Sequence, residues 1–484
     1  MATTKKTTRK KSSSNSLEKT TKKACKKIYK KNKNNPVFWV IVLVLILTIA
    51  FGVVYVTVIN PSVLDKLLKR NTPDTPTIVE PAENTSVDTS KEVESSKNTS
   101  VDTSKEVVEG FNYPDFQIHF MTLGNDKAGD SVYIKAGEND ILIDAGSRSN
   151  SSTTTLSYMN NYVKDKKLEY VIATHGDQDH IEAFPNILSQ YSAGIIIYNQ
   201  NTSKTGSKAT GAYKNMVAAF QNQVTKNSAK IYYAGDCFNN QNGAKRTYQL
   251  SAKVTMDIMY NYYYWNKSGD ENNYSVCTMF TYASSTGNKY FMLTGDLEKE
   301  GEEKLAEYYD SSSLEKTLPH VDLFKAGHHG SKTSSNDVLL NKIQPKMCVV
   351  SCCCGTDEYT GATINQFPTQ AFINRIAKWT DMVYVTSIYD SFSIEKAGSK
   401  TDKNGKLVSD KTGVEIGKEY IHSTGRKDMN GDIVVSCGET EGIIKIGLTA
   451  SNNLIKLKDS DWMATKVTID GVEQFVREMP EEWK

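Results

Sequence analysis

The position of the histidines constrains the fold of this chain most, because they are few and clustered. Four of the seven occur in two short polar clusters, each directly after an apolar run typical of a strand. The first cluster reads THGDQDH and follows the run EYVIA. Four ligand-type side chains within six residues can converge only in a turn at a strand end, where a metal ion could sit. A chance polar loop is the alternative that this spacing disfavours. The four residues are His175, Asp177, Asp179 and His180.

Three further polar elements also follow apolar runs. Asp144 ends the run in LIDAG, and Asp296 ends the run in LTGD. A carboxylate held in such a turn can bridge two cations or orient a ligand histidine through its ring N–H, and the second role suits Asp144. The last element, KAGHHGSKTSS, offers paired histidines and donors for an anion. These residues are His328, His329, Ser331 and Lys332.

The rest of the body alternates short apolar runs with amphipathic stretches, which predicts a layered α/β sandwich. Apolar residues make up 38% of the chain, enough for a large core, so a wholly disordered chain is excluded. Strands are expected at 116–123, 131–136, 140–144, 170–174, 194–198, 254–260, 275–282, 290–294, 321–326, 347–351, 382–386 and 432–436. Helices are expected near 153–164, 181–190, 213–223, 299–309, 338–343 and 369–378.

A 23-residue run without charge or proline, Val37–Ile59, is long enough to span a membrane. Residues 1–35 before it hold thirteen Lys and Arg and one acid, a net charge of +12, so the remainder carries −10. Basic residues stay on the cytoplasmic side, which places the C-terminal body outside the cell membrane. A cleaved signal peptide is the alternative, but the run is too long and no small-residue cleavage site follows. The tail suits contact with anionic lipid better than nucleic acid.

Five segments follow from these patterns. Residues 1–35 are the basic cytoplasmic tail and 36–60 the single transmembrane anchor. Residues 61–113 form a disordered Ser/Thr-rich linker in which NTSVDTSKEV occurs twice. Residues 114–440 form the sandwich domain, with a polar excursion at 395–430. Residues 441–484 are expected to be a small appended unit.

Taken together and in this order, the motifs resemble the metallo-β-lactamase-fold superfamily. Within it, GDSVYI, ILIDAG, THGDQDH, NNYSV, LTGD and HHGSKTSS look like the hydrolase domain of ComEC-type competence DNA-uptake proteins. The resemblance covers about residues 114 to 440. It implies a four-layer αββα sandwich with one or two divalent metal ions at one edge of the two sheets. The many-helix channel of those proteins has no counterpart here.

The resemblance also implies roles for the site residues. Asp179, His180, Asp296 and one of the paired histidines would form the more complete metal site, and His328 is favoured because it is nearest the strand end. His175, Asp177 and a bridging Asp296 would form a second, poorer site. The ligand set is rich in oxygen, which favours Mn²⁺ alongside Zn²⁺.

Two departures from the family pattern concern the poorer site. Asp177 stands where many members have histidine, and no histidine lies between residues 180 and 320. Asp270, Asn272 and Asn273 are the nearest polar replacements in that interval. A third departure is Phe367, which precedes Pro368 where related domains tend to carry His-Pro.

The implied activity is metal-dependent hydrolysis, with a metal-bound hydroxide attacking a phosphodiester. Asp177 or Asp179 would relay the proton, and Ser331 or Lys332 would steady a phosphoryl oxygen. Nucleic acid is the substrate that the family suggests, although the −10 body argues against it because negative charge repels polyphosphate. A cell-wall polymer with phosphodiester links, such as teichoic acid, is the competitor, given the outward-facing stalk. The alternative is a degenerate metallohydrolase fold that serves as a surface binding or assembly module, which the missing histidine favours.

The cysteines point to no disulfide framework. Cys25 lies in the cytoplasmic tail, and seven cysteines lie beyond the apolar run, an odd number. The triple Cys352–Cys354 follows an apolar strand and is expected to provide partly buried thiols. Binding of a soft metal is the weaker alternative, because the spacing is not C-x-x-C.

Overall fold

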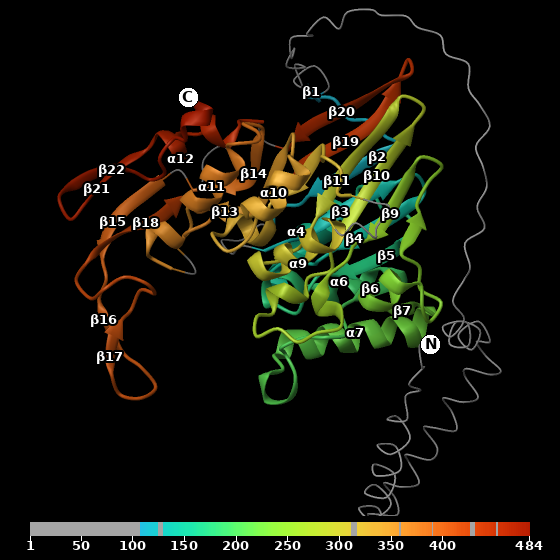
Figure 1. Ribbon diagram of the computed structural model, residues 1–484. Coiled ribbons are helices and arrows are strands. Elements are labelled where there is room, and N and C mark those ends of the chain that lie inside the picture. Colours follow the sequence, from blue (N-terminus) through green and yellow to red (C-terminus); the bar gives the residue numbers. More distant parts are fainter. Residues whose placement is uncertain are drawn as a thin grey trace, which may run out of the picture. The chain divides into compact units, whose positions relative to one another are not determined.

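The computed structural model describes residues 107–123, 129–310, 317–357, 360–389, 391–425, 431–451 and 454–484 (Figure 1). The predicted basic tail, transmembrane anchor and most of the linker lie outside these ranges. Within them, no helix combines the length and the apolar character needed to cross a membrane.

The described strands form two large sheets that face each other. The first sheet has nine strands in the order β1-β20-β19-β2-β3-β4-β5-β6-β7, and the second has seven in the order β14-β13-β12-β11-β10-β9-β8. The first comprises β1 (Val107–Glu109), β20 (Ile443–Ala450), β19 (Ile433–Thr440), β2 (Phe116–Phe120), β3 (Val132–Ala136), β4 (Asn139–Ile143), β5 (Lys167–Ala173), β6 (Ser192–Tyr198) and β7 (Lys230–Tyr233). The second comprises β14 (Val383–Ile388), β13 (Cys348–Cys354), β12 (Leu323–Lys325), β11 (Gly287–Leu293), β10 (Thr278–Ser284), β9 (Val254–Ile258) and β8 (Thr247–Gln249).

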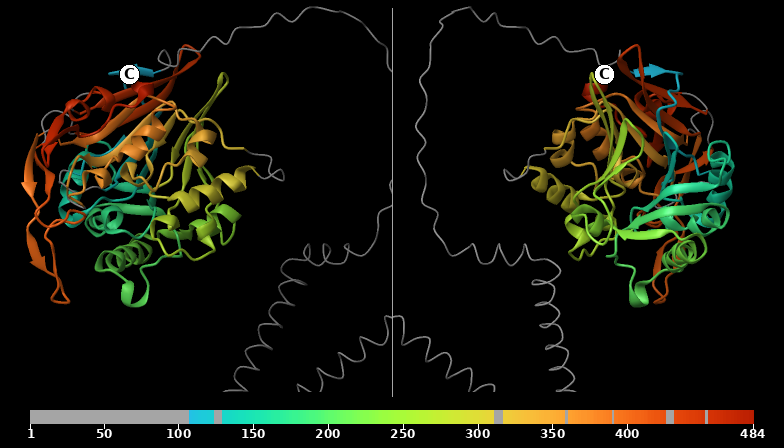
Figure 2. Two further views of the ribbon diagram at one scale, coloured as in Figure 1. Left: turned by 60° about the vertical axis from the view of Figure 1, so that its left-hand side comes forward. Right: turned by 90° about the vertical axis from the view of Figure 1, so that its right-hand side faces the viewer.

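Helices cover the outer face of each sheet, so the predicted αββα layering is present (Figures 1 and 2). One core cluster joins the nine-stranded sheet to α4 (Arg148–Met159), α6 (Phe184–Gln190) and α7 (Gly211–Asn227). Another joins the seven-stranded sheet to α9 (Lys299–Asp310), α10 (Asp337–Ile343) and α11 (Gln370–Ile376). The largest cluster lies between the two sheets.

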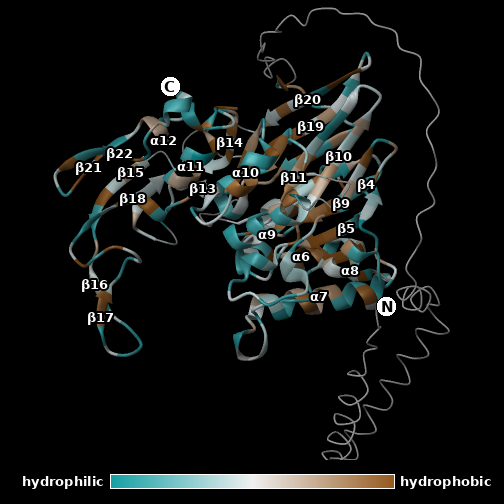
Figure 3. Cartoon of the chain, viewed as in Figure 1, coloured by the Kyte–Doolittle hydropathy of each residue, from teal (hydrophilic) through white to brown (hydrophobic). Residues whose placement is uncertain are grey.

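Alternation along the strands explains why the chain forms three apolar layers. In β4, Ile141 and Ile143 pack between the sheets, whereas Leu142 packs against the helices on the other face. Successive side chains of a strand point to opposite faces, so a strand covered on both sides reads as a continuous apolar run. Figure 3 shows the hydrophobic colour concentrated on strands such as β5 and β9 and the hydrophilic colour on the outer helix α9.

Both ends of the predicted sandwich domain need correction. Val107–Glu109, expected in the linker, forms β1 and pairs in parallel with β20. The boundary expected after residue 440 falls inside a β-hairpin, because β20 pairs with β19 along its whole length. Trp462 and Trp483 then bury their rings against the outer face of the seven-stranded sheet. The C-terminal residues therefore complete the nine-stranded sheet and the outer layer of the seven-stranded sheet. They do not form a separate appended unit.

The polar excursion expected at 395–430 is a β-structured arm (Figure 1). Strands β15 (Ser391–Lys396) and β18 (Glu419–Gly425) pair antiparallel, and β16 (Ser399–Thr401) pairs with β17 (Leu407–Ser409) beyond them. A third two-stranded sheet, β21 (Lys466–Ile469) with β22 (Val472–Phe475), contacts the arm.

The described cysteine thiols are buried and unpaired, in line with a chain that has no disulfide framework. They are Cys237, Cys277, Cys348, Cys352, Cys354 and Cys437. Burial raises the pKa of the Cys352 thiol well above its ordinary value, which makes it a poor metal ligand. Among the described residues, the groups of side chains with metal-ligand geometry contain no cysteine.

Two substitutions in β20 test whether the C-terminal strand belongs to the core. Leu448 is fully buried between the sheets, whereas Ile443 on the same strand is 59% exposed. Leu448→Ala is expected to lower the free energy of unfolding by about 2–5 kcal/mol, because it leaves a cavity. Ile443→Ala is expected to cost about 1 kcal/mol or less. Denaturant titrations of both variants measure this, and equal small effects would contradict the placement of β20.

Candidate metal centre

The predicted site residues gather at one edge of the sandwich, where strands of both sheets end. Asp144 follows β4, and the THGDQDH cluster follows β5, which lies parallel to β4. Asp296 follows β11, and the paired histidines follow β12, which lies parallel to β11. Parallel neighbours end at the same edge, so residues far apart in the sequence meet there.

Three histidine rings are each held through Nδ1, so that Nε2 is left for the centre. The Nδ1 of His180 donates to Asp144 Oδ2 at 2.7 Å, and that of His329 donates to the Ser351 carbonyl at 2.7 Å. The Nδ1 of His175 lies 3.1 Å from the Thr174 hydroxyl, which itself donates to Asp144. A ring anchored in this way presents its other nitrogen as a metal ligand.

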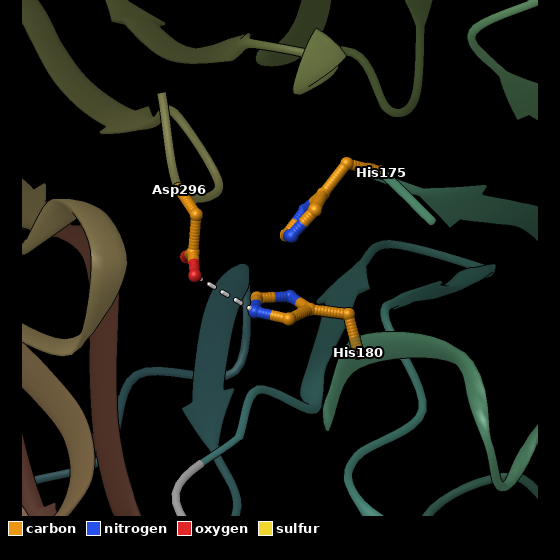
Figure 4. Close-up of side chains that lie close together, drawn as sticks. All are labelled: His175, His180 and Asp296. Atoms are coloured by element: carbon orange, nitrogen blue, oxygen red, sulfur yellow. Dashed lines mark hydrogen bonds and ion pairs between the residues drawn. The ribbon is translucent and has the colours of Figure 1, made fainter. Parts of the chain in front are cut away.

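Asp296 is the carboxylate that the Nε2 atoms share. Its Oδ2 lies 3.1 Å from Nε2 of His180 and 3.5 Å from Nε2 of His329 (Figure 4 shows the contact with His180). Asp179 Oδ2 lies 3.3 Å from Nε2 of His329. Among the described residues, three groups have ligand atoms close enough to hold an ion, and all three share His180. They are His175 with His180 and Asp296, Asp179 with His180 and His329, and Asp130 with Asp144 and His180.

The protein residues present fit a divalent metal ion. In the described part of the chain, Nε2 of His175, Nε2 of His329 and Oδ1 of Asp296 are buried without a hydrogen-bond partner. Buried polar atoms are rarely left unsatisfied, and these belong to groups with metal-ligand geometry that share His180, which fits a bound cation. Histidine nitrogens with carboxylate oxygens are the donors that Zn²⁺ and Mn²⁺ accept.

The pKa shifts of the buried groups show that the carboxylates of the centre need positive charge nearby. Burial alone would raise the pKa of Asp296, but the imidazoles of His180, His329 and His328 hold it well below its ordinary value. Burial alone would lower the pKa of His180, but Asp296 and Asp144 raise it well above its ordinary value. In the absence of a metal ion, a proton on His180 therefore balances part of this negative charge.

Sequence reasoning missed a buried ion pair beneath the ligands. Lys325, the last residue of β12, places its Nζ 2.5 Å from Asp130 Oδ2 and 3.9 Å from Asp296 Oδ1. Burial lowers the pKa of Lys325, but Asp130 and Asp296 outweigh it, and the net shift is upward. A lysine at the end of an apolar strand was the sequence signal that could have indicated this ion pair. Its partner Asp130 lies in the GDSVYI motif that carries part of the family resemblance.

The structure reverses the preference between the paired histidines. His329 is fully buried with its ring toward Asp179 and Asp296, whereas Nε2 of His328 is 4.0 Å from Asp296 and its Nδ1 pairs with Glu298. Both residues adopt left-handed backbone angles, with φ of 44° and 51°. That turn rotates the second histidine inward, so nearness to the strand end was the wrong criterion.

The cavity above the ligands has a volume of about 250 Å³. It is lined by Asp177, Asp179, Asn272, Asp296, His328 and Phe367. Phe367 therefore reaches the site as an aromatic wall in place of the histidine of related domains. Of the polar replacements considered for the missing histidine, Asn272 lines the cavity, and its amide nitrogen lies 3.2 Å from Glu298 Oε1.

The expected anion donors do not line this cavity. Ser331 Oγ is 2.8 Å from the Thr333 hydroxyl, and Lys332 Nζ donates to Asn365 Oδ1 at 2.8 Å. Their turn leads away from the ligands into α10, so the geometry gives no support to a substrate contact from either. Besides Lys325, the ammonium of Lys204 reaches the centre, where it pairs with Asp177 at 2.6 Å. No pattern in the sequence singled it out.

Comparisons with known proteins agree with the motifs. Residues 124–208 match the family model of the metallo-beta-lactamase superfamily. The chain is 38% identical over 66 residues to ComE operon protein 3 of Bacillus subtilis (strain 168), covering 14% of this chain and 8% of that protein. It is 34% identical over 110 residues to competence protein ComA of Neisseria gonorrhoeae, covering 23% and 14%.

Among solved structures, the metallo-beta-lactamase fold protein YhfI from Bacillus subtilis is similar at 11% identity. It matches over 60% of this chain and 99% of its own, with a TM-score of 0.32. Residues 124–208 thus resemble the metallo-beta-lactamase superfamily, and short segments of the chain are similar to competence proteins. The matched segments span 8% and 14% of the two competence-related proteins named above.

Metal binding is expected to release protons. The pKa of His180 lies well above its ordinary value, so an ion must displace that proton at every lower pH. Apparent affinity is therefore expected to weaken as pH falls. Calorimetric titration with Mn²⁺ or Zn²⁺ in two buffers of different ionisation enthalpy measures the release, and heats that do not depend on the buffer would contradict it.

Asp144→Asn is expected to weaken metal binding about 10–100-fold, because it removes the charge that orients and polarises His180. Asp140→Asn is the matched control. Asp140 is also buried on β4, but it pairs with Tyr133 and Lys135 away from the centre. Equilibrium dialysis of both variants gives the affinities, and an equal loss in the two would show that the effect does not pass through His180.

Proposed function

We propose that this chain is a hydrolase that uses a divalent metal ion, Mn²⁺ or Zn²⁺, to cleave phosphodiester bonds. The observation that carries the proposal is that anchored histidine Nε2 atoms and carboxylates form groups with metal-ligand geometry that share His180. Several of these buried atoms have no hydrogen-bond partner. The superfamily to which the matched segment corresponds is generally hydrolytic, which supports the same reading.

Asp179, His180, Asp296 and His329 would hold the ion. When bound, the ion supplies a Lewis acid and lowers the pKa of a water ligand toward neutrality. The chain's own residues then have separable tasks. Asp144 and the Ser351 carbonyl keep His180 and His329 oriented, and Lys325 neutralises the carboxylates from below.

Proton transfer would fall to the carboxylates that line the cavity. Burial alone would raise the pKa of Asp177, but His175 and Lys204 outweigh it and hold the pKa well below its ordinary value. The pKa of Asp179 is likewise lowered, because His329 and His180 outweigh burial. Both are therefore ionised at neutral pH, which is the form that can accept a proton.

The substrate would be a polymer with phosphodiester links, either nucleic acid or a cell-wall polymer such as teichoic acid. The relatives named above are a ComE operon protein and a competence protein, which favours nucleic acid. The apolar run Val37–Ile59 and its basic flank support a single-pass membrane protein with the cytoplasmic end at the N-terminus and this domain outside.

The proposal predicts turnover of a chromogenic bis-aryl phosphodiester that is abolished by chelation and restored by Mn²⁺ or Zn²⁺. Asp179→Ala and His329→Ala are each expected to lower kcat/KM by more than about 100-fold, beyond the loss typical of residues that only orient ligands. His328→Ala is expected to lose less, because His328 lies on the cavity wall.

Asp140→Asn serves as the folded control with full turnover. Equal losses in His328→Ala and His329→Ala would contradict the ligand assignment. Metal-bound protein without turnover on phosphodiesters would contradict the substrate class. Protein that binds no metal would favour the surface binding or assembly module instead.

A further inference from the structure

The side of the centre around Asp177 holds a fixed positive charge. Lys204 Nζ lies 2.6 Å from Asp177 Oδ1, and Asp177 Oδ2 lies 3.6 Å from Nε2 of His175. We propose that the Lys204 ammonium takes the place of the second metal ion, so that the centre binds a single ion between Asp179, His180, Asp296 and His329. This inference rests on the proposed metal-dependent function.

The backbone around Lys204 is locked against the THGDQDH turn by one buried carboxylate. Glu271 Oε1 accepts from the Gly176 N–H at 2.8 Å and from the Thr202 hydroxyl at 2.7 Å. Its Oε2 accepts from the N–H and the hydroxyl of Ser203 at 2.6 and 2.7 Å. The segment that carries Lys204 is therefore clamped to the segment that carries His175 and Asp177.

Gly176 allows the Glu271 carboxylate to approach the backbone of the THGDQDH turn closely. A Cβ at this position would lie 2.5 Å from Glu271 Oε1, a distance that requires something to shift. The clamp brings the Lys204 backbone to the turn, and the side chain, only partly exposed, reaches Asp177 from there. The contact is thus built into the fold at this position and does not depend on a mobile surface lysine.

The two sides of the centre differ in whether their own ligands are already paired with a lysine. His180 and Asp296 are shared, the Asp179 side adds Asp179 and His329, and the other side adds His175 and Asp177. On that other side Asp177 already pairs with Lys204. Asn272 offers it no further ligand, since it turns its amide toward Glu298 and His328.

Charge adds to this asymmetry. A divalent ion bound to Asp177 would lie within a few ångströms of the Lys204 ammonium, and like charges at that distance repel strongly in a partly buried site. Lys204 already neutralises Asp177, so a second ion gains less from binding there. The pairing of Asp177 with Lys204 and the repulsion between the two cations therefore favour one ion.

The test is the number of metal ions bound, measured on the full chain. Chelated protein is dialysed against Mn²⁺, its metal content is measured by mass spectrometry, and its electron paramagnetic resonance spectrum shows whether two Mn²⁺ ions are coupled. Lys204→Met is compared with Lys208→Met, an exposed lysine four residues further on. Lys204→Gln replaces the methionine variant if that variant does not fold.

Wild type and Lys208→Met are expected to bind one uncoupled Mn²⁺ per chain. Lys204→Met is expected to approach two ions per chain with a coupled spectrum, and to return to one when Asp177→Asn is added. Two coupled ions in the wild type, or one ion in both Lys204 variants, would overturn this inference and leave the hydrolase proposal standing. No ion in the wild type would overturn the metal centre itself.

Discussion

The concentration of negative charge at one edge of the sandwich is the constraint on which the rest of the centre depends. Carboxylates from separate chain segments meet there, and most are shielded from water; they are Asp130, Asp144, Asp177, Asp179 and Asp296. Buried like charges cannot remain together unless cations offset them. Lys325 supplies one cation from below and Lys204 another from the side. His180, whose pKa these carboxylates raise well above its ordinary value, supplies further positive charge as a proton.

Backbone geometry decides which side chains reach that edge. Asp144, His328 and His329 all have positive φ angles, between 44° and 57°, a region that non-glycine residues seldom occupy. Such angles persist only where the surroundings hold them, and here each turn ends a strand whose direction would otherwise carry the chain past the site. Gly295 turns in the same region, and a Cβ there would lie 2.9 Å from the side chains of Thr174 and Ser275. The strands bring the segments together, and these turns aim the ligands.

The sequence allowed the layers and most of the ligands to be predicted, because both follow from local patterns. Apolar runs marked the strands, and the polar residues directly after them marked the strand ends. What could not be predicted depends on contacts between distant segments. The choice of His329 over His328 follows from two left-handed residues, and no pattern of residue types shows those angles.

The same limit explains the other omissions. Lys204 reaches the centre only because Glu271, 67 positions further along the chain, clamps its loop to Gly176. The strand β20 looked like part of an appended unit because it joins the sheet through β19, which pairs with β2 more than 300 residues earlier in the chain. Lys325 was hidden in an apolar strand, where a charged residue is noticed only when its buried partner is known.

The cavity is too small to hold more than the reacting group of a polymer, so different parts of the protein would recognise the bond and the polymer. At about 250 Å³ it is smaller than the pockets that enclose whole ligands, so only the reacting group of a polymer would enter. The rest of the polymer would lie across the rim of the cavity, where Phe367 forms one wall. The segment leading to Phe367 is bonded to the arm, since the N–H of Gly361 donates to the Thr412 carbonyl at 2.8 Å. Under the proposed function, the ligands would determine which bond is cleaved, and the rim and arm would determine which polymer is held, so the two properties can change independently.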